Sequence, residues 1–72
     1  MNNRPFDLLN DAMNKEVLVV LKGNNQVRGT LIAFDVHMNL HLENASQIVD
    51  GEIKTKYGKA LLRGDSVILI SP

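Results

Sequence analysis

The sequence predicts a mainly β protein, in which a short N-terminal α-helix is followed by a strongly bent five-stranded antiparallel sheet. Two observations indicate this fold class. Helical spacing of apolar residues ends near Met13, and the rest of the chain is a series of β-branched and aliphatic segments separated by Gly, Asn and Asp. A chain of 72 residues has room for a single domain. One helix and five strands of this size favour a small barrel of the SH3-like or OB kind.

The helix is expected over Arg4–Met13. Pro5 suits the first helical turn, where its missing N–H is no loss. Asn2 or Asn3 is a candidate N-cap, and Asn14 a candidate stop. The side expected to face the core consists of Phe6, Leu9, Ala12 and Met13, with Leu8 beside them.

The first two strands are expected over Glu16–Lys22 and Gln26–Asp35, with turn residues at Lys22–Asn25 between them. The second strand is long and contains Gly29 in its interior. An internal glycine often marks a bulge or sharp bend. We therefore expect the sheet to curl here.

A short loop, Asp35–Asn39, leads to a third strand over Leu40–Val49, where apolar and polar residues alternate. Asp50–Glu52 is expected to be a turn, and Lys54–Lys56 the rim of a loop. The fourth strand is expected over about Tyr57–Arg63.

Gly64 and Asp65 form the next turn, and the fifth strand is expected over Ser66–Ile70. Its residues Val67–Ile70 form an unbroken apolar run, which the edge strand of a monomer should avoid. We interpret this run as a subunit interface.

The amino-acid composition leaves few ways to stabilise such a small domain by cross-links or metal ions. The chain contains no cysteine and only two histidines, which excludes disulfides and thiolate zinc sites and leaves little for another metal. Association of subunits is then the natural way to complete the core. The 8 basic and 8 acidic residues cancel, so a nucleic-acid role would depend on base contacts or local charge rather than on many phosphate contacts.

No apolar run approaches the roughly 18 residues that a membrane span requires. The first five residues lack the apolar stretch of a signal peptide. A cytoplasmic protein without a membrane partner is expected.

Two segments carry a family resemblance. Residues 8–45 resemble the first Sm motif, with Gly29 and the run Asp35-Val36-His37-Met38-Asn39-Leu40. Residues 58–70 resemble the second, centred on Leu62-Arg63-Gly64-Asp65-Ser66-Val67. The chain, 1–72, therefore resembles a single Sm-like domain, closest to the archaeal type. The bacterial host-factor branch typically has Tyr-Lys-His where this chain has Arg63-Gly64-Asp65.

The resemblance implies a fold, an assembly and a ligand. Sm-like proteins have a helix followed by a strongly bent five-stranded sheet. They form rings, usually heptamers in archaea, in which the fourth strand of one subunit pairs with the fifth strand of the next. We expect a homo-oligomeric ring, with seven subunits favoured and six as the alternative. It would bind uridine-rich single-stranded RNA near its pore, one base per subunit, as a scaffold or chaperone in RNA metabolism.

The resemblance also implies a uridine pocket made by His37, Asn39, Arg63 and Asp65. The residue types suit this role, because single-stranded RNA is read by stacking a base on flat groups and bonding its edge. His37 and Arg63 supply flat groups, and the amide of Asn39 can read uracil's edge. We expect Asp65 to hold that amide in orientation and also to pair with Arg63. Asp35 is expected to order its loop.

The sequence contains candidates for other sites and functions. Arg4, on the helix, is a possible second RNA contact. No cofactor is expected, and no metal, because His37 and His41 would lie roughly 13 Å apart along a strand. An enzyme is disfavoured because the serines have no general base at recognisable spacing. A proline-peptide module would need more aromatic residues than one Tyr and two Phe. A purely structural ring remains an alternative.

Overall fold

The computed structural model describes residues 4–72 and contains one helix and one five-stranded antiparallel sheet. The strands lie in the order β4-β3-β2-β1-β5, so β4 and β5 are the two open edges. Along the chain the elements are α1 (Pro5–Asp11), β1 (Glu16–Leu21), β2 (Asn25–Phe34), β3 (Leu40–Val49), β4 (Glu52–Leu62), the 3-10 turn η1 (Gly64–Ser66) and β5 (Val67–Ser71).

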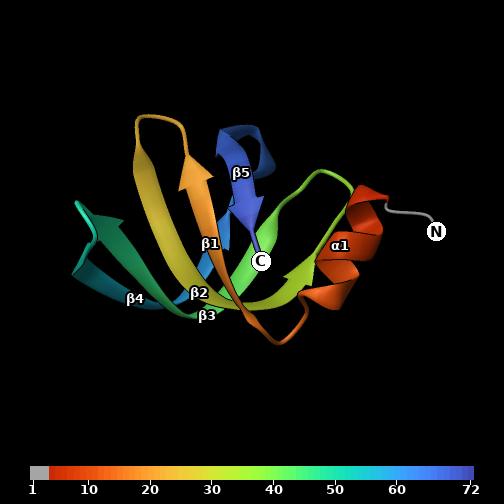
Figure 1. The fold of residues 1–72 in the computed structure, drawn as a ribbon, viewed down its shortest axis with the longest axis horizontal. Coiled ribbons are helices and arrows are strands. Elements are labelled where there is room, and N and C mark those ends of the chain that lie inside the picture. The colour runs from red at the N-terminus through yellow and green to blue at the C-terminus, as the bar shows by residue number, and fades with distance from the viewer. Residues whose placement is uncertain (1–3) are drawn as a thin grey trace.

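The helix is shorter than expected. It spans Pro5–Asp11, and its N-cap is Arg4, whose side chain makes no capping hydrogen bond. Asn2 and Asn3, the candidate caps, lie outside the described residues. Leu9 is buried, while the ring of Phe6 lies 5.8 Å from the ring of Phe34 at the end of β2. The helix thus covers one end of the sheet (Figure 1).

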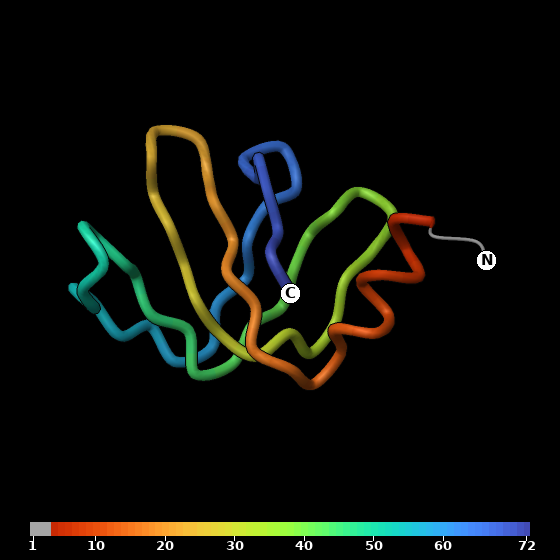
Figure 2. The backbone as a smooth tube through the Cα atoms, in the orientation of Figure 1, coloured from red at the N-terminus to blue at the C-terminus, as the bar shows by residue number. Residues whose placement is uncertain are grey.

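The sheet bends where its strands lose regular pairing. The register between β2 and β3 shifts near Gly29, and a Cβ at Gly29 would lie 3.1 Å from the Cα of Ala45. Across β3 and β4, Asn44 and Gly58 both have positive φ, 52° and 76°. Such bulges increase twist and bend a strand. Figure 2 shows the resulting sharp curve of β2 and β3. The strongly bent sheet is confirmed, and Gly29 lies at a bend.

The concave side of the bend holds the core. The largest fully buried side chains are those of Val17 and Val19 in β1, Leu31 in β2, and Leu40 and Leu42 in β3. Within residues 4–72, every buried side-chain nitrogen or oxygen has a hydrogen-bond partner. The core is therefore built mainly from β1, β2 and β3.

The fourth strand is where the sequence-based expectation was wrong. β4 begins at Glu52, so Lys54–Lys56 belong to the strand and do not form a loop rim. Thr55 and Lys56 pair with Gln47 and Ser46 of β3. The first eight of the 11 residues of β4 are exposed, and they include the apolar side chain of Ile53 and the ring of Tyr57.

Candidate nucleic-acid interface

Two connections of the chain meet at one end of the barrel. The first is the loop between β2 and β3, residues 35–39, and the second is η1 with the preceding Arg63. Together they line a cavity of about 450 Å³, formed by His37, Asn39, Arg63, Gly64 and Asp65. The four residues expected to form a site are thus brought together, although Arg63 lies 24 positions after Asn39 in the sequence.

Asp35 organises the first loop. Its Oδ1 accepts hydrogen bonds from the backbone N–H groups of His37, at 2.9 Å, and Asn39, at 3.0 Å. Its Oδ2 accepts a third from Nδ2 of Asn39, at 3.0 Å. Met38 takes a positive φ of 63° and packs against the core. The expectation that Asp35 orders the loop is confirmed.

The amide of Asn39 ties the two connections together. While Nδ2 donates to Asp35, Oδ1 accepts a hydrogen bond from the backbone N–H of Gly64 at 2.8 Å. Reversing the amide would place its NH₂ against another N–H and its oxygen against a carboxylate. Both contacts are repulsive. The orientation of the Asn39 side chain is therefore fixed.

This arrangement corrects the role expected of Asp65. Asp35, not Asp65, holds the amide of Asn39, because Asp35 is four residues away in the same loop. Asp65 accepts a hydrogen bond from Nη2 of Arg63 at 3.2 Å, the pairing that the sequence suggested. A second, longer bond comes from the Ser66 hydroxyl at 3.5 Å. Both side chains of the Arg63–Asp65 pair remain largely exposed, at 80% and 65%.

Gly64 permits the close approach of the two connections. A Cβ on this residue would overlap the carbonyl oxygen of His37. Any other residue would therefore push η1 away from the loop. The Gly64 N–H would then lose its bond to Asn39.

We expect the loop to loosen in acid. The side-chain and backbone N–H groups of Asn39, together with the N–H and imidazole of His37, hold the pKa of Asp35 below its usual value. A lowered pKa means that the ionised carboxylate contributes stability above its unfolded-state pKa of about 3.9. That contribution is lost as the pH falls through the folded-state pKa. NMR titration of the Asp35 carboxyl carbon should give a midpoint below about 3.9, with the His37 and Asn39 amides shifting in parallel.

The Asp35→Asn variant is the control for this titration. It should remove the parallel shift of the two amides. A midpoint at or above the unperturbed value in the parent protein would contradict the arrangement.

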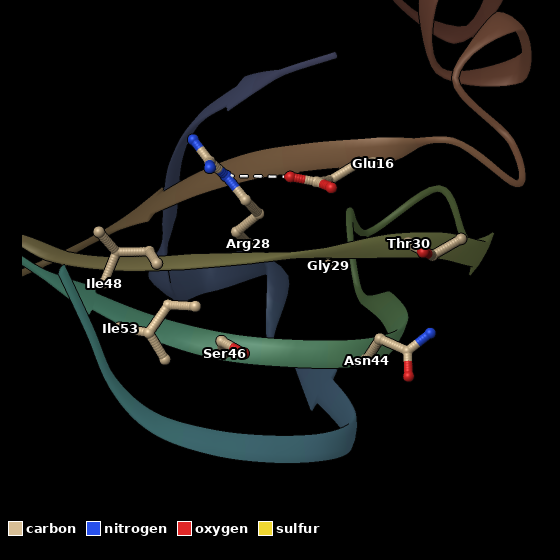
Figure 3. A pocket seen from close by; sticks show the side chains of 8 residues that line it. All are labelled: Glu16, Arg28, Gly29, Thr30, Asn44, Ser46, Ile48 and Ile53. Carbon is tan, nitrogen blue, oxygen red and sulfur yellow. Dashed lines mark ion pairs between the residues drawn. The ribbon is translucent and has the colours of Figure 1, made fainter. Parts of the chain in front are cut away.

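A separate hollow of about 350 Å³ lies on the sheet face opposite the core (Figure 3). The Nε of Arg28 is 3.2 Å from Oε1 of Glu16, an ion pair whose side chains are 54% and 64% exposed. Ile48 and Ile53 form its apolar end. Exposed pairs of this type contribute little to stability. Arg28 is therefore a suitable control position for tests of Arg63.

Two further expectations concern metal ions and membranes. Over residues 4–72, His, Cys, Asp and Glu side chains do not gather in any group of three or more that could hold a metal ion. In the same part of the chain no helix is long and apolar enough to span a membrane.

Comparisons with known proteins agree with this fold. Residues 7–72 match the LSM domain family. An Sm-like protein of Methanococcoides burtonii is 53% identical over 72 residues, with 100% of both chains covered. A solved structure of an Sm protein from Pyrococcus abyssi, in complex with a uridine heptamer, has a TM-score of 0.93 and 46% identity. It covers 97% of this chain and 99% of that one.

A heptameric SmAP1 from P. aerophilum has a TM-score of 0.90 and 40% identity, and covers 100% of this chain and 96% of its own. The matches extend over nearly the whole sequence in each case. They also include both segments that carry the Sm motifs. This chain therefore belongs to the LSM domain family of Sm and Sm-like proteins.

Proposed function

We propose that this protein forms a homo-oligomeric ring that binds uridine-rich single-stranded RNA, one base per subunit, in the cavity around Asn39. Seven subunits are favoured and six are the alternative. The observation that carries the proposal is the locked amide of Asn39 in a cavity that the exposed side chains of His37 and Arg63 also line. The uridine complex of the P. abyssi relative supports it.

The chemistry of the cavity fits uracil. Each polar atom of the Asn39 amide has used half of its hydrogen-bonding capacity. One lone pair of Oδ1 and one hydrogen on Nδ2 remain. Uracil presents an N3–H beside a carbonyl, so it matches an acceptor next to a donor. Cytosine presents the reverse pattern at N3 and N4 and would require the amide to turn over. A base bound in this way would stack between His37 and Arg63.

The open edges of the sheet support the ring. β4 and β5 each pair with a neighbouring strand on one edge only, and each carries exposed apolar side chains, with Leu61 at 74% and Ile68 at 63%. An apolar groove of about 300 Å³ between α1 and β5 is lined in part by Leu8 and Leu69. In our proposal β4 of one subunit pairs with β5 of the next and covers this groove. Such a head-to-tail contact closes into a ring when its rotation divides the circle.

A ring accounts for binding by a chain with no net charge. It places one cavity per subunit around a central pore, so weak sites act together on one RNA strand. The heptameric relative from P. aerophilum favours seven subunits. Arg4, the N-cap of α1, is 76% exposed and paired with Asp7 at 3.4 Å, and it is proposed as a secondary RNA contact.

The role that follows is that of a scaffold or chaperone in RNA metabolism, not of an enzyme. The cavity is built from stacking and edge-reading groups. Its neighbouring hydroxyl, on Ser66, donates to the Asp65 carboxylate rather than to a histidine base. A cytoplasmic location is part of the proposal.

Native mass spectrometry with heptanucleotides tests assembly and base preference together. We expect one dominant oligomer of seven subunits, occupied by oligouridine at concentrations where oligocytidine and oligoadenine of equal length bind poorly. Cytosine would meet the locked amide in the wrong orientation, and a purine would fit the stacking slot less well. A stable monomer at micromolar concentration would overturn the ring. Equal affinity for all three strands would remove the role of Asn39.

A further inference from the structure

The carboxylate of Asp65 is a charged hydrogen-bond acceptor beside the base cavity. In the proposed binding mode the edge of uracil makes no hydrogen bond to it. Its Oδ2 accepts from Arg63 and its Oδ1 accepts a long bond from Ser66, at 3.2 and 3.5 Å. Each carboxylate oxygen keeps further acceptor capacity. The side chain is 65% exposed and lines the same cavity as His37 and Asn39.

The chemistry of a uridine within an RNA strand limits what Asp65 can contact favourably. An ionised carboxylate accepts hydrogen bonds and donates none. The nucleotide offers two donors, the N3–H of the base and the 2′-hydroxyl of the ribose. In the proposed binding mode the N3–H donates to Oδ1 of Asn39. The phosphates are acceptors and carry the same sign of charge as Asp65, so they are repelled.

The position of the carboxylate matches the remaining donor. The bond from Nη2 holds Asp65 at the edge of the Arg63 guanidinium, which is the proposed stacking surface. A ribose is attached to the rim of its base. The sugar of a base stacked on the guanidinium therefore projects past an edge of that wall, where an acceptor held at the edge can meet it.

We propose that Asp65 accepts a hydrogen bond from the ribose 2′-hydroxyl and so makes the ring select RNA over DNA. This rests on the proposed function, since it requires a uridine in the cavity. Asp65 is then a specificity-determining residue, and its ion pair with Arg63 joins base stacking to sugar recognition. A seven-subunit ring would repeat the selection at each occupied cavity, so a modest preference per sugar would become a large one for a strand.

Three heptamers test the assignment: oligouridine, its 2′-fluoro analogue and oligodeoxyuridine. The 2′-fluoro sugar keeps the ribose pucker but has no hydrogen to donate, so it isolates the hydrogen bond from sugar shape. A hydrogen bond to a charged group is typically worth enough for about tenfold in affinity. The parent ring should therefore bind oligouridine at least about tenfold more tightly than the 2′-fluoro strand. Oligodeoxyuridine should also bind weakly.

In Asp65→Ala we expect the ratio between oligouridine and the 2′-fluoro strand to fall to about twofold or less, with the ring mass unchanged. Asp65→Asn keeps an acceptor oxygen but loses the charge, so its ratio should lie between the two. Arg28→Ala, whose side chain lines the separate hollow in Figure 3, should keep the parent ratio.

Several results would overturn the proposal. One is a parent ring that binds oligouridine and the 2′-fluoro strand equally while still preferring oligouridine to oligocytidine. That result would support recognition of the base by Asn39 and contradict recognition of the 2′-hydroxyl by Asp65. Another is an Asp65→Ala ring that binds both strands more weakly with the ratio preserved, since Asp65 would then act only by bracing Arg63. If the parent ring bound none of the strands, the proposed function itself would fail.

Discussion

Arg63→Ala should lower the affinity of the ring for oligouridine by orders of magnitude while leaving the ring assembled. The substitution removes one wall of the proposed stacking slot, and stacking of a base on a flat side chain is worth roughly 1–3 kcal/mol. The loss is repeated in each subunit. Fluorescence anisotropy with labelled oligouridine measures the affinity, and native mass and thermal melting report the assembly.

Structure explains why the ring should survive this change. Arg63 is 80% exposed, and its ion pair with Asp65 is exposed as well, so the pair contributes little to stability. Arg28→Ala removes a guanidinium that is also exposed and also ion-paired, on the sheet face shown in Figure 3. It should leave oligouridine binding near the parent level. A ring that fell apart on Arg63→Ala, or that kept its RNA affinity, would show that Arg63 is not a stacking wall.

Disrupting either open edge of the sheet should abolish the ring. Proline at Ile68 removes a backbone donor from β5. Ile68 has no partner in β1, because the β1–β5 register shifts between Val20 and Leu21. We therefore expect Ile68→Pro to disturb the outer edge more than the core and to give monomer or aggregate by native mass spectrometry.

Leu61→Glu should have the same effect from the β4 edge, by placing a charge where an apolar contact is proposed.

A mixture of the two variants tests directly whether β4 of one subunit pairs with β5 of the next. Each variant retains one intact edge, β4 in Ile68→Pro and β5 in Leu61→Glu. A head-to-tail contact predicts a one-to-one heterodimer from the mixture and no closed ring, because each pair uses up the only intact edges. Persistence of seven-membered rings in either single variant would place the interface elsewhere.

Most of the fold follows from patterns that are local in the sequence. β3 was predicted with its observed bounds, Leu40–Val49, because apolar and polar residues alternate there. The first half of β4 was missed, since Lys54–Lys56 carries no apolar periodicity. What makes this segment a strand is its pairing with Gln47 and Ser46 of β3, a contact that propensity does not encode.

Paired motifs predicted four residues that line one cavity, but the contacts that orient the Asn39 amide were not predicted. A carboxylate four residues before Asn39 was a local signal that Asp35 would hold the amide. Asp65 was expected to hold the amide instead. The contact between Gly64 and the Asn39 oxygen joins residues 25 positions apart. This contact depends on how closely the turn after β4 approaches the loop before β3. Only the three-dimensional arrangement reveals that Asn39 is locked from both sides.

The close contact at Gly64 can form only when β3 and β4 are paired in the correct register. The loop before β3 and the turn after β4 meet only if β4 is paired with β3 in the correct register. A slip of one residue would move the turn by about 3.3 Å and bring a residue with a side chain against the His37 carbonyl. A misaligned subunit therefore has no base cavity. In the proposed mode of binding only a correctly aligned subunit holds RNA, so RNA would favour that subunit over misaligned forms.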